Sequence, residues 1–160
     1  MAMPTLTTYG GLEFEAGYAG NLVSATDHTI ESKVLEGALS VDFGVAVARG
    51  ATNGTCKAPT VDGDQIIGIS VRHATMAALP GNIVLYAPTA AVPVLKFGFI
   101  YAVATEATAQ GDGVISRTAT NGALGSTTGG AAGVGRVAVP GAKWEDAVAI
   151  GAIGRIRIVS

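Results

Sequence analysis

The chain is poor in the residues that carry most protein chemistry. Among its 160 residues there are one cysteine and two histidines, and charged residues make up 14% of the sequence. An ordinary soluble domain has about 25% charged residues. A single cysteine excludes an intramolecular disulfide and a cysteine-rich zinc site. These absences leave few ways to build an active site.

Two further absences exclude classes of partner. No run of Lys or Arg exists, and the net charge is −2, so the basic surface of a nucleic-acid binder is missing. No stretch approaches the ~20 consecutive apolar residues of a membrane helix. The start of the chain, Met1–Thr5, has neither a basic end nor an apolar segment. We therefore expect no secretory signal, and synthesis and use in a cytoplasm.

Apolar residues are nevertheless abundant. They make up 49% of the sequence although only 6% is aromatic, so most of them are Ala, Val, Ile and Leu. The mean hydropathy is +0.45. At this length the chain is expected to form one domain. An apolar content this high gives more apolar surface than one small domain would leave in water. We therefore expect another protein to cover part of that surface.

The sequence contains an internal repeat. Ala-Thr-Asn-Gly occurs at 51–54 and again at 119–122, and each copy follows an apolar run that begins with Gly44 or Gly113. Further matches follow in both halves and close on 81–85 and 154–158. A repeat of strand, Asn-Gly turn, strand, loop and strand is typical of a β scaffold.

The turn signals predict an all-β fold. They recur every eight to twelve residues and separate about ten short strands, which is typical of a β-sandwich or a barrel, jelly-roll-like in form. Pro93 predicts that residues 92–96 form an edge strand or a bulge, with a separate strand at 97–104. The Gly-rich stretch 122–133 is predicted to be a surface loop.

The first 30 residues differ from the rest. Glycines interrupt short alternating segments, which predicts an extended N-terminal arm (1–30) with one or two edge strands, followed by the β domain (31–160). The alternative is a disordered tail. Tyr9, Phe14 and Tyr18 argue against that alternative, because aromatic residues are uncommon in segments that never order.

No catalytic group emerges from the sequence. Ser70, His73 and Asp64 could be arranged as a triad, but the segment 68–72 lacks the second glycine of a nucleophile elbow. His73 and the other histidine, His28, are interpreted as ordinary surface or interface residues.

The remaining motifs favour structural roles. Asp62-x-Asp64 resembles the start of a calcium loop, but no further acidic residue completes the ligand set, so a turn is predicted. Cys56 lies beside a turn and is interpreted as a buried or half-buried residue rather than a reactive thiol. Glu13 and Glu15 share one face of a strand in the arm and form a solvated surface. We expect no catalytic, cofactor-binding or metal site.

Several segments carry a resemblance to a known family. They combine a hydrophobic spacing with fixed glycine positions, and they are residues 37–47, 64–71, 110–114, 133–137 and 155–159. In these segments, and from about residue 20 to the end, the chain resembles the small decoration, or cement, proteins of tailed bacteriophages. The resemblance implies a β-rich protein without catalytic residues that binds the outside of the major capsid shell as an oligomer at its symmetry axes.

The expected function is therefore structural. The chain would be made in the host cytoplasm, bind the major capsid protein at the virion surface, and stabilise the shell by bridging neighbouring capsomers. A trimer is expected, because trimers match the local threefold positions of an icosahedral shell, with a dimer as the alternative. Tyr9, Phe14 and Tyr18 are the predicted capsid-binding residues, since buried aromatic residues dominate association energetics. No cofactor, nucleic acid or membrane is expected.

Two other functions stay open. A head-fibre or tail-associated β structural protein would have the same composition. A carbohydrate-binding β module would usually expose Trp and Tyr for stacking on sugars, and this chain has one Trp and four Tyr. A small hydrolase is the least favoured, because no convergent catalytic groups exist.

Overall fold

The described part of the chain is all-β, which confirms the predicted fold class. The computed structural model describes residues 8–9, 12–13, 18–23, 27–72, 85–126 and 134–159. In these residues there are eleven strands and one short 3-10 turn, η1 (Thr118–Thr120). The strands are β1 (Thr8–Tyr9), β2 (Leu12–Glu13), β3 (Thr29–Leu35), β4 (Ala46–Arg49), β5 (Thr55–Lys57), β6 (Ile66–Ser70), β7 (Ala91–Val103), β8 (Gly113–Arg117), β9 (Ala123–Ser126), β10 (Arg136–Trp144) and β11 (Ile153–Ile158).

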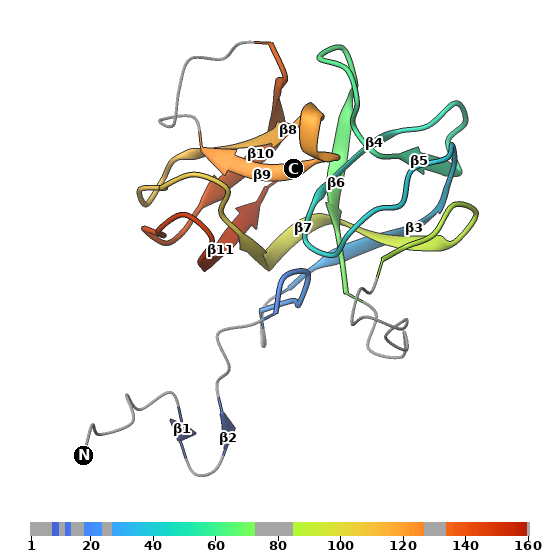
Figure 1. The fold of residues 1–160 in the computed structure, drawn as a ribbon. Coiled ribbons are helices and arrows are strands. Elements are labelled where there is room, and N and C mark those ends of the chain that lie inside the picture. Colours follow the sequence, from blue (N-terminus) through green and yellow to red (C-terminus); the bar gives the residue numbers. More distant parts are fainter. Residues whose placement is uncertain are drawn as a thin grey trace.

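Within the described residues, β3 to β11 form one continuous sheet that closes on itself. Its order is β3-β5-β4-β6-β7-β11-β10-β8-β9, and β3 also pairs with β7. The strands β3, β5, β4, β6 and β7 therefore close into a barrel. The other strands continue from β7, and Figure 1 shows them as a second group beside the barrel. Of the two predicted architectures, the barrel is correct.

The second group of strands follows the same order as the first. In the barrel, β5 is parallel to β3 and antiparallel to β4. In the second group, β9 is antiparallel to β8, and a parallel bridge joins Leu124 of β9 to Ala104 at the end of β7. The sequence repeat is therefore a repeat of strand order, and β7 is the last strand of the first half and the first strand of the second.

Equivalent hydrogen bonds confirm the two halves. The N–H of Glu36 donates to the carbonyl of Cys56 at 2.8 Å, and the N–H of Thr105 donates to the carbonyl of Leu124 at 2.9 Å. The backbones of Val41 and Tyr86 bond in both directions, as do those of Thr108 and Val148. The two halves thus match at the bonds that close each one.

The predicted match between 81–85 and 154–158 is wrong. The N–H of Leu35 donates to Ala90 and the N–H of Ala104 donates to Ala152, so the segment before β7 is the counterpart of the segment before β11. Residues 81–84 lie outside the described residues. Both segments are apolar and follow a glycine or a turn, so composition alone did not distinguish the correct partner from a neighbouring run.

Pro93 does not mark an edge strand, which is one of the two predicted alternatives. The other alternative, a bulge, agrees with the register of β3 against β7, which shifts between Leu95 and Phe97. Pro93 lies inside β7, which continues for 13 residues and pairs with β3 and β6. The carbonyl of Pro93 accepts a hydrogen bond from the N–H of Val71. Because the N and O of one strand residue point to the same side, the missing N–H of Pro93 faces the end of β6, where the ladder stops. A proline there costs no ladder bond.

Two hydrophobic cores fill the structure. The first lies inside the barrel and includes Leu35, Val47 and Val94, with Phe43 against Tyr86 edge to face at 5.0 Å between ring centres. The second is larger, gathers around Trp144, and also takes in side chains of β4, β6 and β7. Because strands of the barrel supply side chains to the second core, the two halves pack as one unit.

Part of the predicted loop 122–133 is a strand. Residues 123–126 form β9, and residues 127–133 lie outside the described residues. Apart from the buried Leu124, the residues of β9 are small, and larger side chains from elsewhere hold them. The indole N–H of Trp144 donates to the carbonyl of Gly125 at 3.0 Å, and the hydroxyl of Thr105 donates to the carbonyl of Leu124 at 2.7 Å.

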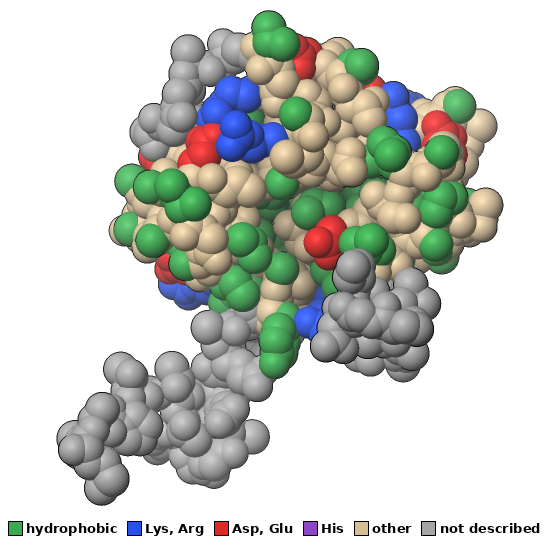
Figure 2. All heavy atoms as spheres, viewed as in Figure 1, with side chains coloured by type: hydrophobic (Ala, Val, Ile, Leu, Met, Phe, Trp, Pro, Cys, Tyr) green, Lys and Arg blue, Asp and Glu red, His purple; other side chains and the backbone are tan. Residues whose placement is uncertain are grey.

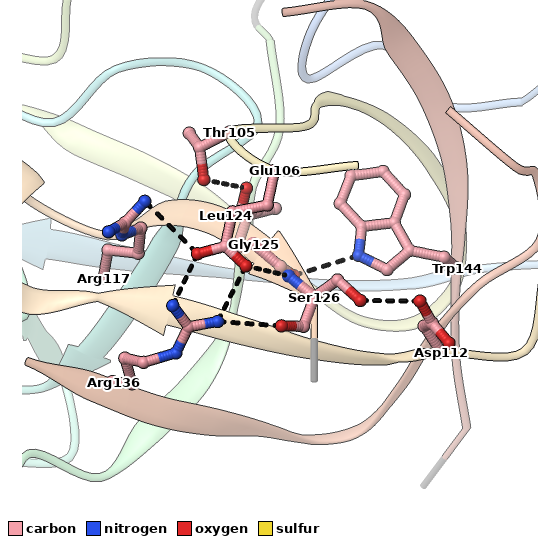
Figure 3. Close-up of polar contacts among 9 residues, drawn as sticks. All are labelled: Thr105, Glu106, Asp112, Arg117, Leu124, Gly125, Ser126, Arg136 and Trp144. Carbon is pink, nitrogen blue, oxygen red and sulfur yellow. Dashed lines mark hydrogen bonds and ion pairs between the residues drawn. The ribbon is translucent and has the colours of Figure 1, made fainter. Parts of the chain in front are cut away.

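An ionic network completes the closure of the second half (Figure 3). Glu106 lies just beyond β7 and accepts two hydrogen bonds from Arg136 of β10, at 2.5 and 2.7 Å. Arg117 of β8 lies 3.2 Å from the same carboxylate. Arg136 also donates to the carbonyl of Ser126, the last residue of β9. Glu106, through Arg136 and Arg117, therefore joins the end of β7 to β8, β9 and β10. The backbone supplies only one bridge between β7 and β9 among the described residues.

This network sets a pH dependence. The hydrogen bonds from Arg136 hold the pKa of Glu106 below its ordinary value, although burial opposes this. Because the folded-state pKa is lowered, the stabilisation is present above the ordinary carboxyl pKa and is lost as the pH falls through the lowered value.

We expect Glu106→Gln to lower the free energy of unfolding at pH 7 by about 1.5–3 kcal/mol, the usual contribution of hydrogen bonds to a charged group. The difference from the wild type should shrink as the pH falls below about 4. Denaturant unfolding at several pH values measures both. Glu145→Gln is the control, because Glu145 pairs with the half-exposed Arg157 at 2.9 Å and should contribute less than about 1 kcal/mol. Equal stability of Glu106→Gln and the wild type at pH 7 would contradict this role.

Candidate interaction surface

Two residues of the triad that the sequence disfavoured, Ser70 and Asp64, have structural roles. Ser70 is fully buried, and its hydroxyl donates to the carbonyl of Asp42 at 2.6 Å. Asp64 forms an ion pair with Lys57 at 2.6 Å. Burial opposes ionisation of Asp64, but the hydrogen bond from Lys57 and two backbone N–H groups outweigh it and lower the pKa of Asp64. His73 lies outside the described residues. Ser70 and Asp64 are thus fixed by partners that hold the fold.

The other polar motifs also hold the structure together. Asp64 accepts from the N–H groups of Thr60 and Val61, as expected for a turn. Asp62 instead reaches the second half, where it accepts from the N–H of Gly135 at 2.8 Å. Among the described residues, no three His, Cys, Asp or Glu side chains are grouped closely enough to hold a metal ion.

Cys56 is a buried thiol, as the sequence predicted. It lies in β5 with no exposed surface. Burial, helped by the nearby charge of Glu36, raises the pKa of the Cys56 thiol to about 11. The thiol is therefore protonated at neutral pH and is not a nucleophile.

No helix in the described ranges is long and apolar enough to cross a membrane.

The three predicted contact residues differ in what the structure describes. Tyr9 lies in β1, where its backbone pairs with that of Leu12. Phe14 lies outside the described residues. Tyr18 is 52% exposed, and the guanidinium of Arg72 lies 4.7 Å from the centre of its ring. The structure therefore gives surroundings for one of the three side chains.

The segment that follows Tyr18 is joined to the β domain. The N–H of Gly20 donates to the carbonyl of Tyr101 at 2.8 Å, and the N–H of Tyr101 donates to the carbonyl of Asn21 at 2.9 Å. The N–H of Val23 donates to Phe99 at 3.2 Å. Residues 20–23 thus lie along β7 as a short additional strand, inside the predicted arm.

Two glycines make this close approach possible. A Cβ atom on Gly20 would lie 2.9 Å from the backbone N atoms of Arg72 and Gly44, and one on Gly44 would lie 2.6 Å from the N of Gly20. Both glycines have positive φ, +85° and +68°. Since a side chain at either position would meet backbone atoms in a strained conformation, these glycines fix where the N-terminal segment joins the barrel.

An apolar hollow lies beside this junction. It has a volume of about 280 Å³, and Ala19, Phe43, Val45, Val103 and Ala123 are among its lining residues. These come from both halves and from the N-terminal segment. In Figure 2, hydrophobic side chains are visible in the depression between the two halves. Such a surface suits contact with another protein, because it is concave and has little charge.

Further large apolar side chains are exposed over the described surface, as the composition led us to expect. They include Ile30, Val34, Leu39, Val61, Phe97, Val103, Val134, Ile150 and Val159. Figure 2 shows hydrophobic atoms spread over the visible face among few charged ones. Sequence reasoning found this excess but not its location, and it missed Arg72, which supports Tyr18 from a distant position in the chain.

Comparison with known proteins agrees with this arrangement. The solved structure titled "The capsid of Myoviridae Phage XM1" contains a chain of the same fold, with a TM-score of 0.68 and 21% sequence identity. The match covers 88% of this chain and 89% of that one. A search of curated protein sequences found no match.

A family model covers nearly the whole sequence. It is described as "Structural cement protein (E217 gp24/Pam3 gp6)" and matches residues 6–159. The match includes both halves of the repeat and the N-terminal segment that lies along β7. The chain therefore belongs to the family of phage structural cement proteins, a class of capsid-associated virion proteins that is not a class of enzyme.

Proposed function

We propose that this protein binds the outer surface of the major capsid shell and stabilises the shell by bridging neighbouring capsomers. Membership of the cement family is the observation that carries the proposal. The apolar hollow lined by Ala19 and Phe43 and the low charge support it, because a protein that acts by contact needs apolar surface and no catalytic groups. The polar side chains tested above have structural partners, which also favours a structural role over a hydrolase.

The binding would stabilise the shell by mass action. A protein that binds the intact shell but not its separated capsomers raises the free energy of disassembly by RT ln(1 + L/Kd) per site, where L is its free concentration. Bridging requires either two contact surfaces on one copy or an oligomer that presents one surface several times. We propose an oligomer, with a trimer favoured over a dimer for the local threefold positions of an icosahedral shell.

The oligomeric state is directly measurable. We expect the protein to self-associate, because the described surface exposes many large apolar side chains. Sedimentation equilibrium at micromolar concentration should give a trimer, the state that matches the local threefold positions. A dimer would keep the bridging proposal and change its lattice position. A monomer that also fails to bind shells would contradict the proposal.

The N-terminal segment tests the predicted contact residues. We expect deletion of residues 2–17 and the substitution Tyr18→Ala to weaken shell binding by about tenfold or more, because aromatic residues that become buried at an interface dominate association energetics. The midpoint of thermal unfolding should change little, since Tyr18→Ala removes a cation–π contact worth about 0.5–1 kcal/mol. Residues 18–23 are kept because residues 20–23 pair with β7.

Phe97→Ala is the matched control, since Phe97 is an aromatic residue of β7 that is 38% exposed. Shell binding by this variant should stay within about twofold of the wild type. A truncated protein that fails to fold would show that the segment belongs to the core, and unchanged shell binding would exclude Tyr18 as an anchor.

The mechanical effect is the functional test. Undecorated shells mixed with the protein should resist heat or osmotic rupture better than shells alone. The effect should persist in high salt, because apolar contacts are not screened. Retention on a glycan array without shell binding would favour a carbohydrate-binding module instead. Ser70→Ala should leave the rupture resistance of fully occupied shells unchanged, because its hydroxyl holds a turn and carries no reaction.

A further inference from the structure

A second hollow lies where the barrel meets β10 and β11. It has a volume of about 320 Å³, and Ile67, Gly68, Val139, Pro140 and Val159 are among its lining residues. It shares no lining residue with the hollow beside Gly44. Apart from Lys96, its lining residues are apolar or glycine, and Val159 is 46% exposed.

This apolar hollow adjoins a polar one. A hollow of about 250 Å³ is lined by residues that include Lys33, Arg49 and Gln65, and it shares Ile67 and Lys96 with the apolar hollow. The two adjoining hollows are here called together the junction groove, with an apolar end at Val159 and a polar end at Arg49.

The polar end of the junction groove is cationic. Lys33, Arg49 and Lys96 are three of the ten basic residues in a chain whose net charge is −2. Glu31 lies 3.2 Å from the ammonium of Lys33 and 3.8 Å from that of Lys96. This one carboxylate pairs with two of the three cations, so the polar end keeps an excess of positive charge.

The three cations have donors left for a ligand. The ammonium of Lys33 donates to the carbonyl of Asn53 at 2.5 Å, and one guanidinium nitrogen of Arg49 donates to the side-chain oxygen of Asn53 at 2.8 Å. A lysine has three N–H donors and an arginine five. These contacts hold Lys33 and Arg49 toward the groove. They leave other N–H groups of both side chains that can donate hydrogen bonds to a carboxylate.

We propose that the junction groove binds an extended segment of the shell protein that carries an apolar side chain and, further along the same face, an Asp or Glu carboxylate. The inference rests on the proposed function and names the chemistry of the partner. Alternate side chains of an extended segment point the same way at intervals of about 6.5–7 Å. The apolar side chain lies in the hollow at Val159, and the carboxylate binds Lys96 and its neighbours.

The charges set the rate and the orientation of binding more than its final strength. Association with undecorated shells should therefore depend on salt, although rupture resistance of the fully decorated shell persists in salt. The two observations are compatible, because the apolar contacts hold the protein in place once it has bound.

Matched variants test the cationic end. Lys96→Gln should slow association with undecorated shells by about tenfold at low salt and have little effect near 0.5 M salt. Lys143→Gln removes one cation from an exposed position of β10 outside the groove lining and should match the wild type. Glu31→Gln removes the carboxylate that competes with the ligand and should speed association. Equal slowing by Lys96→Gln and Lys143→Gln would show that net charge acts and would overturn the proposal.

A second pair tests the apolar end. Val159→Asp should weaken shell binding by about tenfold or more, whereas Ile150→Asp, at a residue that is 72% exposed and outside both hollows, should stay within about twofold. Thermal unfolding of each variant checks the fold, since both side chains are exposed.

The outcomes separate this proposal from the proposed function. Wild-type protein that does not bind shells overturns both. Wild-type protein that binds, with Lys96→Gln and Val159→Asp binding equally well, overturns the junction groove alone. If these variants lose self-association while each protomer still binds the shell as the wild type does, the groove is a contact with a second copy of the chain. That result would also overturn the proposal.

Discussion

The structure depends on one strand that belongs to two closed sets of strands. β7 pairs with β3 and β6 along its first half and with β11 along its second, and residues 20–23 and Leu124 occupy the remaining positions at its end. Because hydrogen-bonded neighbours flank both edges, the two halves cannot separate without breaking the ladder of β7. A change that shifts the register of β7 would turn its side chains from one core to the other.

The two halves close through different kinds of contact. The barrel closes through paired residues of β3 and β5 and the long ladder of β3 with β7. The second half closes through one backbone bridge, the hydroxyl of Thr105 and the carboxylate of Glu106. An ion pair with little exposed surface replaces ladder bonds at this point, so closure of the second half depends on an ionised carboxylate.

Local patterns were enough to predict the fold class and the repeat. The two Ala-Thr-Asn-Gly copies lie at equivalent turns, and the buried Cys56 follows from its place in a short strand after one of them. The continuity of β7 could not be predicted in the same way, because Pro93 is tolerated only where β6 ends, and that is a fact of the neighbouring strand. The network of Glu106 and the contact of Arg72 with Tyr18 join residues far apart in the sequence, so no local pattern indicates them.

The low number of charged residues also determines the character of the surface. A chain with few charged residues uses several of them in ion pairs that hold strands together, and it leaves apolar side chains exposed in two hollows at the junction of its halves. Two hollows that share no lining residue are two separate candidate surfaces on one copy, which is one of the two ways to achieve the proposed bridging of capsomers. The sequence predicted that apolar surface would need a partner, but its location depends on how β7 unites the halves.

Electron cryomicroscopy of undecorated shells incubated with the protein tests the central claim most directly. The account predicts added density on the outer surface, with the β domain lying across the boundary between neighbouring capsomers and contacting both. Absence of added density, or density confined to a single capsomer or to the tail, would contradict it.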